Sequence, residues 1–133
     1  KGGGRIALVA TAAAGEGGVR VSKLAAAVDI GRVVNRDIAL QQIEGGLLFG
    51  LGLALGSAPD YERGMPTNGR LGALQLPTLA DCPEISVVLI DSNDEPFDPG
   101  EIAVAPVAPA VANALFSATG LRLRRLPLLS DET

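Results

Sequence analysis

The chain has 133 residues, of which 47% are hydrophobic but only 3% aromatic, so a single domain can bury a core built mainly from Ala, Val, Leu and Ile. The net charge of −4 gives no electrostatic basis for binding nucleic acid, and the absence of histidine excludes imidazole catalysis and histidine metal sites within the chain. Cys82 is the single cysteine, which excludes an internal disulfide, and its place before Pro83 and an apolar run favours a buried structural thiol.

The first half of the chain predicts a hairpin and a long helix. Residues 6–12 (IALVATA) form a short apolar run between glycines, typical of a strand, and residues 15–18 predict a turn. Residues 19–30 begin with alternating apolar and polar side chains and are expected to return as a second strand. Asn35 is a favoured N-cap residue, and Asp37 in the first turn suits the helix dipole. The apolar face of the helix is expected to contain Ile38, Ile43, Leu47, Leu51 and Ala54, with Leu40 and Phe49 beside them.

Glycines are unusually frequent in this predicted helix, although each costs about 1 kcal/mol relative to alanine. They are Gly45, Gly46, Gly50, Gly52 and Gly56. Two interpretations follow from the pattern alone: close approach of another backbone or a cofactor, or helix packing through small residues. Gly46 and Gly50 also fit the GxxxG pattern of membrane helix dimers, but the uncharged stretch 45–59 is short and glycine-rich for a membrane span.

The middle of the chain predicts one further strand between loops. The expected segments, in order, are a surface loop at 57–72, an extended segment at 74–79, a buried strand at 85–90 (ISVVLI) and an acidic loop at 91–100.

The C-terminal part predicts a second helix and a closing strand. The helix is expected to follow Pro109, with Val111, Leu115 and Ala118 on one face and Gly120 as its C-cap. Residues 121–126 (LRLRRL) are expected to form the strand. Strands at both ends with helices between them predict the α+β class: a small mixed sheet packed with two helices, in one domain covering residues 1–133.

Two polar side chains are candidates for chemistry. Glu101 follows Asp98-Pro99-Gly100 and precedes an apolar stretch, where desolvation would suit a carboxylate to act as a general base; a solvated loop glutamate is the alternative. Gln42 lies early in the first helix, and its amide can both donate to and accept from polar cofactor groups, although an exposed helix glutamine fits the same pattern. The arginines at 122, 124 and 125 are interpreted as a solvated strand face or an interface patch.

Three segments stand out as strings. Residues 28–51 contain VDIG, an asparagine, QIEGG and FGL; residues 98–114 contain DPGE and APVAPAVANA; residues 118–127 read ATGLRLRRLP. In this order and spacing they resemble the molybdenum hydroxylases, the xanthine dehydrogenase and aldehyde oxidase family, with its VDxG…N…Q-x-EGG and G-x-GE…PxAPAxANA patterns. The last segment is similar to the bacterial isoquinoline 1-oxidoreductase and aldehyde dehydrogenase branch.

The resemblance implies a role for each matched residue. Glu101 corresponds to the family's active-site glutamate, which takes a proton from the molybdenum-bound hydroxyl or water ligand. Gln42 matches a glutamine that contacts the pterin, and Gly45 and Gly46 would let the backbone lie close to the cofactor; no metal ligand is expected from this chain. The implied cofactor is molybdopterin cytosine dinucleotide with molybdenum, and the implied substrates are aldehydes or N-heterocycles.

The resemblance also implies partners. The chain is several times shorter than the family's large subunit, so it is expected to be the C-terminal part of the molybdopterin-binding domain, and inactive alone. It starts at Lys1 with Met65 as its single methionine, which predicts a trimmed or processed product. The implied partners are the remainder of that subunit and a small [2Fe-2S] subunit. Apart from the resemblance, the aromatic-poor core favours packing borrowed from neighbouring protein or a homo-oligomer.

One residue departs from the family pattern: Pro99 stands where the family often has a small or β-branched residue. The alternative function is a non-enzymatic subunit-assembly or interaction module.

Overall fold

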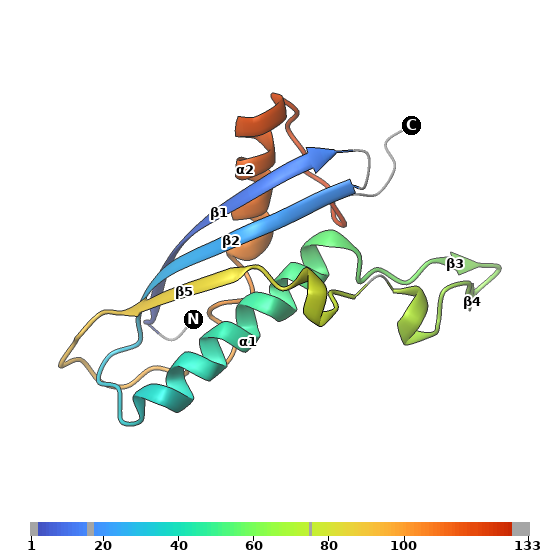
Figure 1. The fold of residues 1–133 in the computed structure, drawn as a ribbon. Coiled ribbons are helices and arrows are strands. Elements are labelled where there is room, and N and C mark those ends of the chain that lie inside the picture. Colours follow the sequence, from blue (N-terminus) through green and yellow to red (C-terminus); the bar gives the residue numbers. More distant parts are fainter. Residues whose placement is uncertain (1–2, 16–17, 75, 129–133) are drawn as a thin grey trace.

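A computed structural model of the chain describes residues 3–15, 18–74 and 76–128. Its main sheet has three strands in the order β1-β2-β5 (Figure 1). Strand β1 (Arg5–Gly15) pairs antiparallel with β2 (Gly18–Asp29), and β5 (Glu84–Leu89) pairs parallel with β2. Two helices, α1 (Arg36–Leu55) and α2 (Val107–Thr119), share one hydrophobic core with this sheet. The predicted α+β class, a small mixed sheet packed with two helices, is confirmed.

The hairpin of β1 and β2 follows the predicted alternation of side chains. On β2, Leu24, Ala26 and Val28 are buried and point toward the helices, while the residues between them are only half-buried. The pairing of β1 with β2 is regular apart from an irregularity between Thr11 and Ala12. The sheet therefore has one covered face and one open face in the described part of the chain.

Helix α1 begins at the predicted N-cap. The Asn35 side chain accepts a hydrogen bond from the backbone N–H of Ile38 at 3.1 Å, and Ile43, Leu47 and Leu51 are buried as expected. The Ile38 prediction was wrong, because this side chain is 58% exposed. By length and composition α1 could cross a membrane, but a core helix of a globular domain meets the same description, and α1 buries its leucine face against the sheet and α2.

The middle of the chain differs from the prediction in detail. The loop at 57–72 contains a small hairpin of β3 (Tyr61–Glu62) and β4 (Met65–Pro66), followed by a 3-10 turn at Leu71–Ala73. No strand forms among the described residues of 74–79; instead a 3-10 turn covers Leu79–Asp81. Strand β5 is confirmed, but it is not buried on both sides, since Val88 is 59% exposed.

Cys82 corrects a further expectation. Its thiol is exposed rather than buried, and Pro83 occupies the buried position instead. The reason is local: the turn at Leu79–Asp81 ends at Cys82, whose Sγ lies 3.6 Å from the carbonyl oxygen of Thr78 on the surface.

Helix α2 starts at Val107, earlier than predicted, and carries Pro109 in its first turn, where a missing N–H costs no hydrogen bond. Gly120 is the predicted C-cap, with φ of 76° and its N–H donating to the carbonyl of Phe116. Ala118 is exposed, which corrects its expected place in the buried face.

The closing strand at 121–126 does not form. The Arg122 guanidinium lies 3.6 Å from the centre of the Phe116 ring, and its Nη1 donates to Asn113 Oδ1 at 2.7 Å. These contacts hold the segment against α2 instead of along a strand. The predicted arginine-bearing strand face is therefore absent.

Candidate functional site

Two glycines of α1 allow the segment 100–107 to pack directly on the helix. A Cβ at Gly46 would lie 3.0 Å from Ala103 Cβ, and a Cβ at Gly50 would lie 2.6 Å from the carbonyl oxygen of Val104. Real Cβ atoms do not approach backbone oxygen so closely. At Gly50 the structure supports close approach of another backbone, whereas at Gly46 the nearest neighbour is the small side chain of Ala103. Both neighbours belong to the segment that carries Glu101.

Gly45 differs from its neighbour Gly46. No atom lies within 4 Å of a Cβ placed there, so its side of α1 is open. Gln42, Gly45 and Phe49 are all exposed, and their spacing of three and four residues puts them on one face of the helix. The structure therefore brings two of the three predicted cofactor contacts, Gln42 and Gly45, onto the same open face, while the third, Gly46, belongs to the packed face.

The backbone around Glu101 is fixed by short-range contacts. Asp98 Oδ1 accepts a hydrogen bond from the N–H of Gly100 at 2.8 Å, which spans Pro99, and the carbonyl of Glu101 accepts from the N–H of Val104 at 3.1 Å. Ile102 and Ala103, the next two residues, are buried. Glu101 itself is exposed, so the described residues do not provide the desolvation expected from the sequence.

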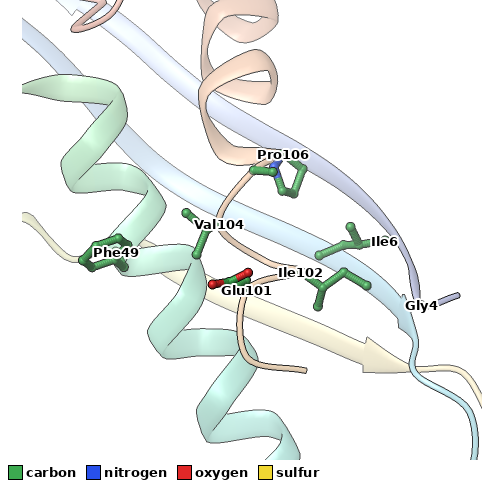
Figure 2. Close-up of a pocket in the computed structure, with 8 residues that line it drawn as sticks. Gly4, Ile6, Phe49, Glu101, Ile102, Val104 and Pro106 are labelled. Carbon is green, nitrogen blue, oxygen red and sulfur yellow. The ribbon is translucent and has the colours of Figure 1, made fainter. Parts of the chain in front are cut away.

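Glu101 lies in the wall of an open hollow of about 730 Å³. Figure 2 shows its carboxylate between Phe49, on α1, and the side chains of Ile102 and Ile6. Among the described residues, its lining is Gly4, Ile6, Phe49, Glu101, Ile102, Val104, Ala105 and Pro106. Among these eight described residues Glu101 is the only ionisable one, so this part of the wall places a carboxylate among apolar side chains.

Phe49 is the site residue whose position sequence reasoning missed. It was expected beside the buried face of α1, but it is 64% exposed and lines the hollow with Glu101. Its spacing from Gln42, seven residues or about two helical turns, was the available signal. Gln42, Gly45 and Gly46 do not line the hollow themselves. Among the described residues, no group of three His, Cys, Asp or Glu side chains is arranged to hold a metal ion.

The family model of the molybdopterin cofactor-binding domain matches residues 7–83, more than half of the chain. The chain belongs to this family. It is 38% identical over 112 residues to a pyrroloquinoline-quinone membrane-bound aldehyde dehydrogenase of Gluconacetobacter polyoxogenes, covering 84% of this chain and 14% of that protein. It is 33% identical over 124 residues to the aldehyde oxidoreductase molybdenum-binding subunit PaoC of Escherichia coli K12, covering 87% of this chain and 17% of the relative.

Solved structures agree with this assignment. The aldehyde oxidoreductase from Desulfovibrio desulfuricans ATCC 27774 superposes with a TM-score of 0.72 at 30% identity, over 84% of this chain and 13% of that one. Quinoline 2-oxidoreductase from Pseudomonas putida 86 gives a TM-score of 0.70 at 25% identity, over 83% and 15%. The family resemblance stated from the sequence is confirmed. The chain spans only 14% and 17% of the length of the two curated relatives described above.

Proposed function

We propose that the chain is the C-terminal part of the molybdopterin-binding subunit of an oxidoreductase that hydroxylates aldehydes or N-heterocycles, with Glu101 as its general base. One observation carries the proposal: in a chain of the molybdopterin cofactor-binding family, the Glu101 carboxylate lies in a hollow whose other described lining residues are apolar, beside an open helix face. An apolar wall suits the hydrocarbon part of an aldehyde or an aromatic heterocycle, and the carboxylate supplies the one polar group needed for proton transfer.

The open face of α1 fits contact with a large polar cofactor. Gly45 has free space where other residues carry a side chain, so the helix backbone can lie close to a ligand there. The exposed amide of Gln42, one turn earlier, can donate and accept hydrogen bonds with pterin or phosphate groups. We propose that these two residues contact the cofactor and that Gly46 acts indirectly, by keeping the Glu101 segment against the helix. The cytosine dinucleotide form of the cofactor is proposed from the family branch.

The positions of these residues suggest separate chemical roles for the cofactor, for Glu101 and for the apolar side chains of the hollow. The bound cofactor would supply the redox chemistry and take up the two electrons from the substrate. The Glu101 carboxylate would accept the proton of the attacking hydroxyl or water oxygen, which makes that oxygen a better nucleophile. The side chains of Ile6, Phe49 and Pro106 would exclude water from the reacting carbon.

The remaining partners are also proposals. Relatives of this chain are named as molybdenum-binding subunits, and one is subunit beta of an isoquinoline 1-oxidoreductase, which supports a multi-subunit enzyme. We propose the remainder of the molybdopterin-binding subunit and a small [2Fe-2S] subunit as partners. Since the chain spans so small a part of its relatives, we expect it to be inactive alone.

The decisive experiment replaces Glu101 in the longer polypeptide that contains this chain. Glu101→Gln keeps the shape of the side chain but removes the base, so turnover should fall by about 10²- to 10⁴-fold or more, with molybdenum and pterin content unchanged. Glu95→Gln is the matched control, because Glu95 is an exposed carboxylate of the same loop that does not line the hollow. Activity of Glu101→Gln equal to that of the control would refute the assignment of the base.

The alternative function is a non-enzymatic subunit-assembly module. Measurement of molybdenum and pterin in the longer polypeptide distinguishes it from the proposed enzyme. Metal and pterin analysis also distinguishes a molybdenum cofactor from the pyrroloquinoline quinone that is named for one relative. Molybdenum and pterin at about one equivalent in the purified longer polypeptide would support the proposed enzyme. Their absence from protein made in its natural host would favour the assembly module or another cofactor.

A further inference from the structure

The small hairpin of β3 and β4 projects away from the main sheet and both helices (Figure 1). Its ladder consists of two residue pairs. Its tip is a tight turn in which Arg63 and Gly64 both adopt positive φ, of 50° and 80°. A two-stranded hairpin of this size is marginally stable by itself, so contacts at its base decide whether it stays folded.

The side-chain amide of Asn68 closes the base of this hairpin. Asn68 Oδ1 accepts a hydrogen bond from the backbone N–H of Asp60 at 2.8 Å. Asn68 Nδ2 donates to the carbonyl oxygen of Ala58 at 2.9 Å and to Asp60 Oδ2 at 3.3 Å. Beside them, the backbone N–H of Thr67 donates to the carbonyl oxygen of Asp60 at 2.8 Å. These four hydrogen bonds are here called the base contacts, and three of them need a group at position 68 that both donates and accepts.

The residue after Asn68 makes this amide chemically reactive. Gly69 is exposed, has no side chain to hinder its backbone nitrogen, and its N–H makes no hydrogen bond to the described residues. The Gly69 nitrogen can therefore attack Cγ of Asn68 and form a cyclic imide, while the side-chain nitrogen leaves as ammonia with the proton of the Gly69 N–H. Water then opens the imide at one of its two carbonyl groups and leaves an aspartate or an isoaspartate at position 68.

An aspartate at position 68 would fit the base contacts poorly. Its carboxylate would still accept from the N–H of Asp60, as the amide does. Its second oxygen has no hydrogen to donate, yet it would face the carbonyl oxygen of Ala58 and the carboxylate of Asp60, where Nδ2 now donates. Two hydrogen bonds would thus be replaced by contacts between oxygen atoms, one of them between like charges, and such contacts destabilise the closed base.

We propose that Asn68 is a modification site and that its deamidation opens the base of the β3–β4 hairpin. The base contacts fix the amide, so Gly69 attacks only in the fraction of molecules in which the base is transiently open, and local stability sets the rate. Loss of ammonia makes the change permanent, because the original amide cannot return. The proposal uses only contacts within residues 58–69 and is independent of the proposed function.

The rate of deamidation tests the role of the base contacts. The longer polypeptide is incubated at mildly alkaline pH, folded or unfolded in urea, and each asparagine-containing peptide is followed by mass spectrometry. In urea, Asn68 should deamidate first among the four asparagines, because the others precede Arg36, Asp94 and Ala114, whose side chains hinder the attack. In the folded protein, Asn68 should deamidate at least about 10-fold more slowly than in urea. Equal rates in the two conditions, or no preference for Asn68 in urea, would overturn the proposal.

Amide hydrogen exchange tests the effect of the modification. In Asn68→Asp, the backbone amides of residues 60 and 67 should exchange at least about 10-fold faster than in the unmodified protein, as in a locally opened segment. Asn93→Asp is the matched control, because it makes the same change in another exposed loop and should leave these two amides unaltered. Unchanged exchange in Asn68→Asp would overturn the proposal.

A second substitution identifies the cause of the opening. Asp60→Asn, added to Asn68→Asp, returns an amide donor to the base contacts and removes the pair of like charges. Exchange at residues 60 and 67 should then return most of the way to that of the unmodified protein. Fast exchange that persists in the double variant would refute repulsion between the two carboxylates as the cause, and with it the proposed mechanism of opening.

Discussion

The variant Gly50→Ala tests whether the packing of segment 100–107 on α1 determines the position of Glu101. The added Cβ would lie 2.6 Å from the carbonyl oxygen of Val104 and 2.8 Å from Val107 Cγ2. The first of these neighbours is a backbone atom, which cannot rotate away as a side chain can. Helix α1 and the segment 100–107 must therefore separate, and the segment carries Glu101 with it.

The expected magnitude follows from two opposed terms. Alanine favours a helix over glycine by about 1 kcal/mol, whereas overpacking a filled interior costs about 1–3 kcal/mol, and we expect the upper end for a rigid backbone neighbour. Gly50→Ala should thus lower the free energy of unfolding by roughly 2 kcal/mol. Gly45→Ala meets no atom within 4 Å and should raise the free energy of unfolding by about 0.5–1 kcal/mol, through helix propensity alone.

Urea unfolding of the chain, followed by circular dichroism, measures both variants. The two should differ by about 3 kcal/mol in the free energy of unfolding, which is far outside the error of the method. A Gly50→Ala variant as stable as Gly45→Ala would refute the close packing of the segment on α1. In the longer polypeptide, Gly50→Ala should also lower turnover although residue 50 does not line the hollow, because it displaces Glu101.

Three further outcomes are expected. Asn35→Ala should lower the free energy of unfolding by about 1 kcal/mol in urea titrations, because the N–H of Ile38 loses its cap; an unchanged midpoint would contradict this role. Hydrogen bonds from the Thr78 hydroxyl and backbone N–H hold the pKa of Asp81 below its usual value. Its stabilising contribution is therefore complete above the pKa of the unfolded chain and is lost as the pH falls through the lowered value, and in NMR titrations Thr78→Val should move that pKa upward. Cys82 should react with a thiol reagent in the native chain at a rate near that of the unfolded chain, and strong protection would contradict its exposed position.

The local elements that carry the candidate site could be predicted from the sequence. Asn35 caps α1 where expected, because capping depends on one side chain and the backbone three residues later. The surroundings of Glu101 were harder, since they depend on how two distant segments meet. Phe49 illustrates this: helical spacing alone allowed it to lie beside the core or on the open face, and packing of residues 100–107 on α1 decided between them.

The predicted strand at 121–126 is a second case in which an alternating sequence did not give the expected structure. Residues 121–126 alternate as a strand should, yet Arg122 stacks on Phe116 and bonds to Asn113 on α2, and these contacts outside the pattern decide the path of the chain. The exposed Cys82 has a similar cause, because a single turn at Leu79–Asp81 places the thiol on the surface. Hydropathy predicts neither the missing strand nor the exposed thiol. It describes how strongly each residue favours burial, but not which other side chains or turns determine its position.

The sequence by itself determined the family, the α+β class, the hairpin, both helices and Glu101 as the candidate base, because each depends on motifs or on periodicity within one segment. Only the tertiary structure decided that Gly46 and Gly50 receive the segment 100–107, that Phe49 joins Glu101 in one hollow, and that Val9 and Val88 stay exposed on the sheet. The physical reason is that these features are contacts between segments far apart in the chain. Their distances are set by the packing of the whole core and not by any local preference.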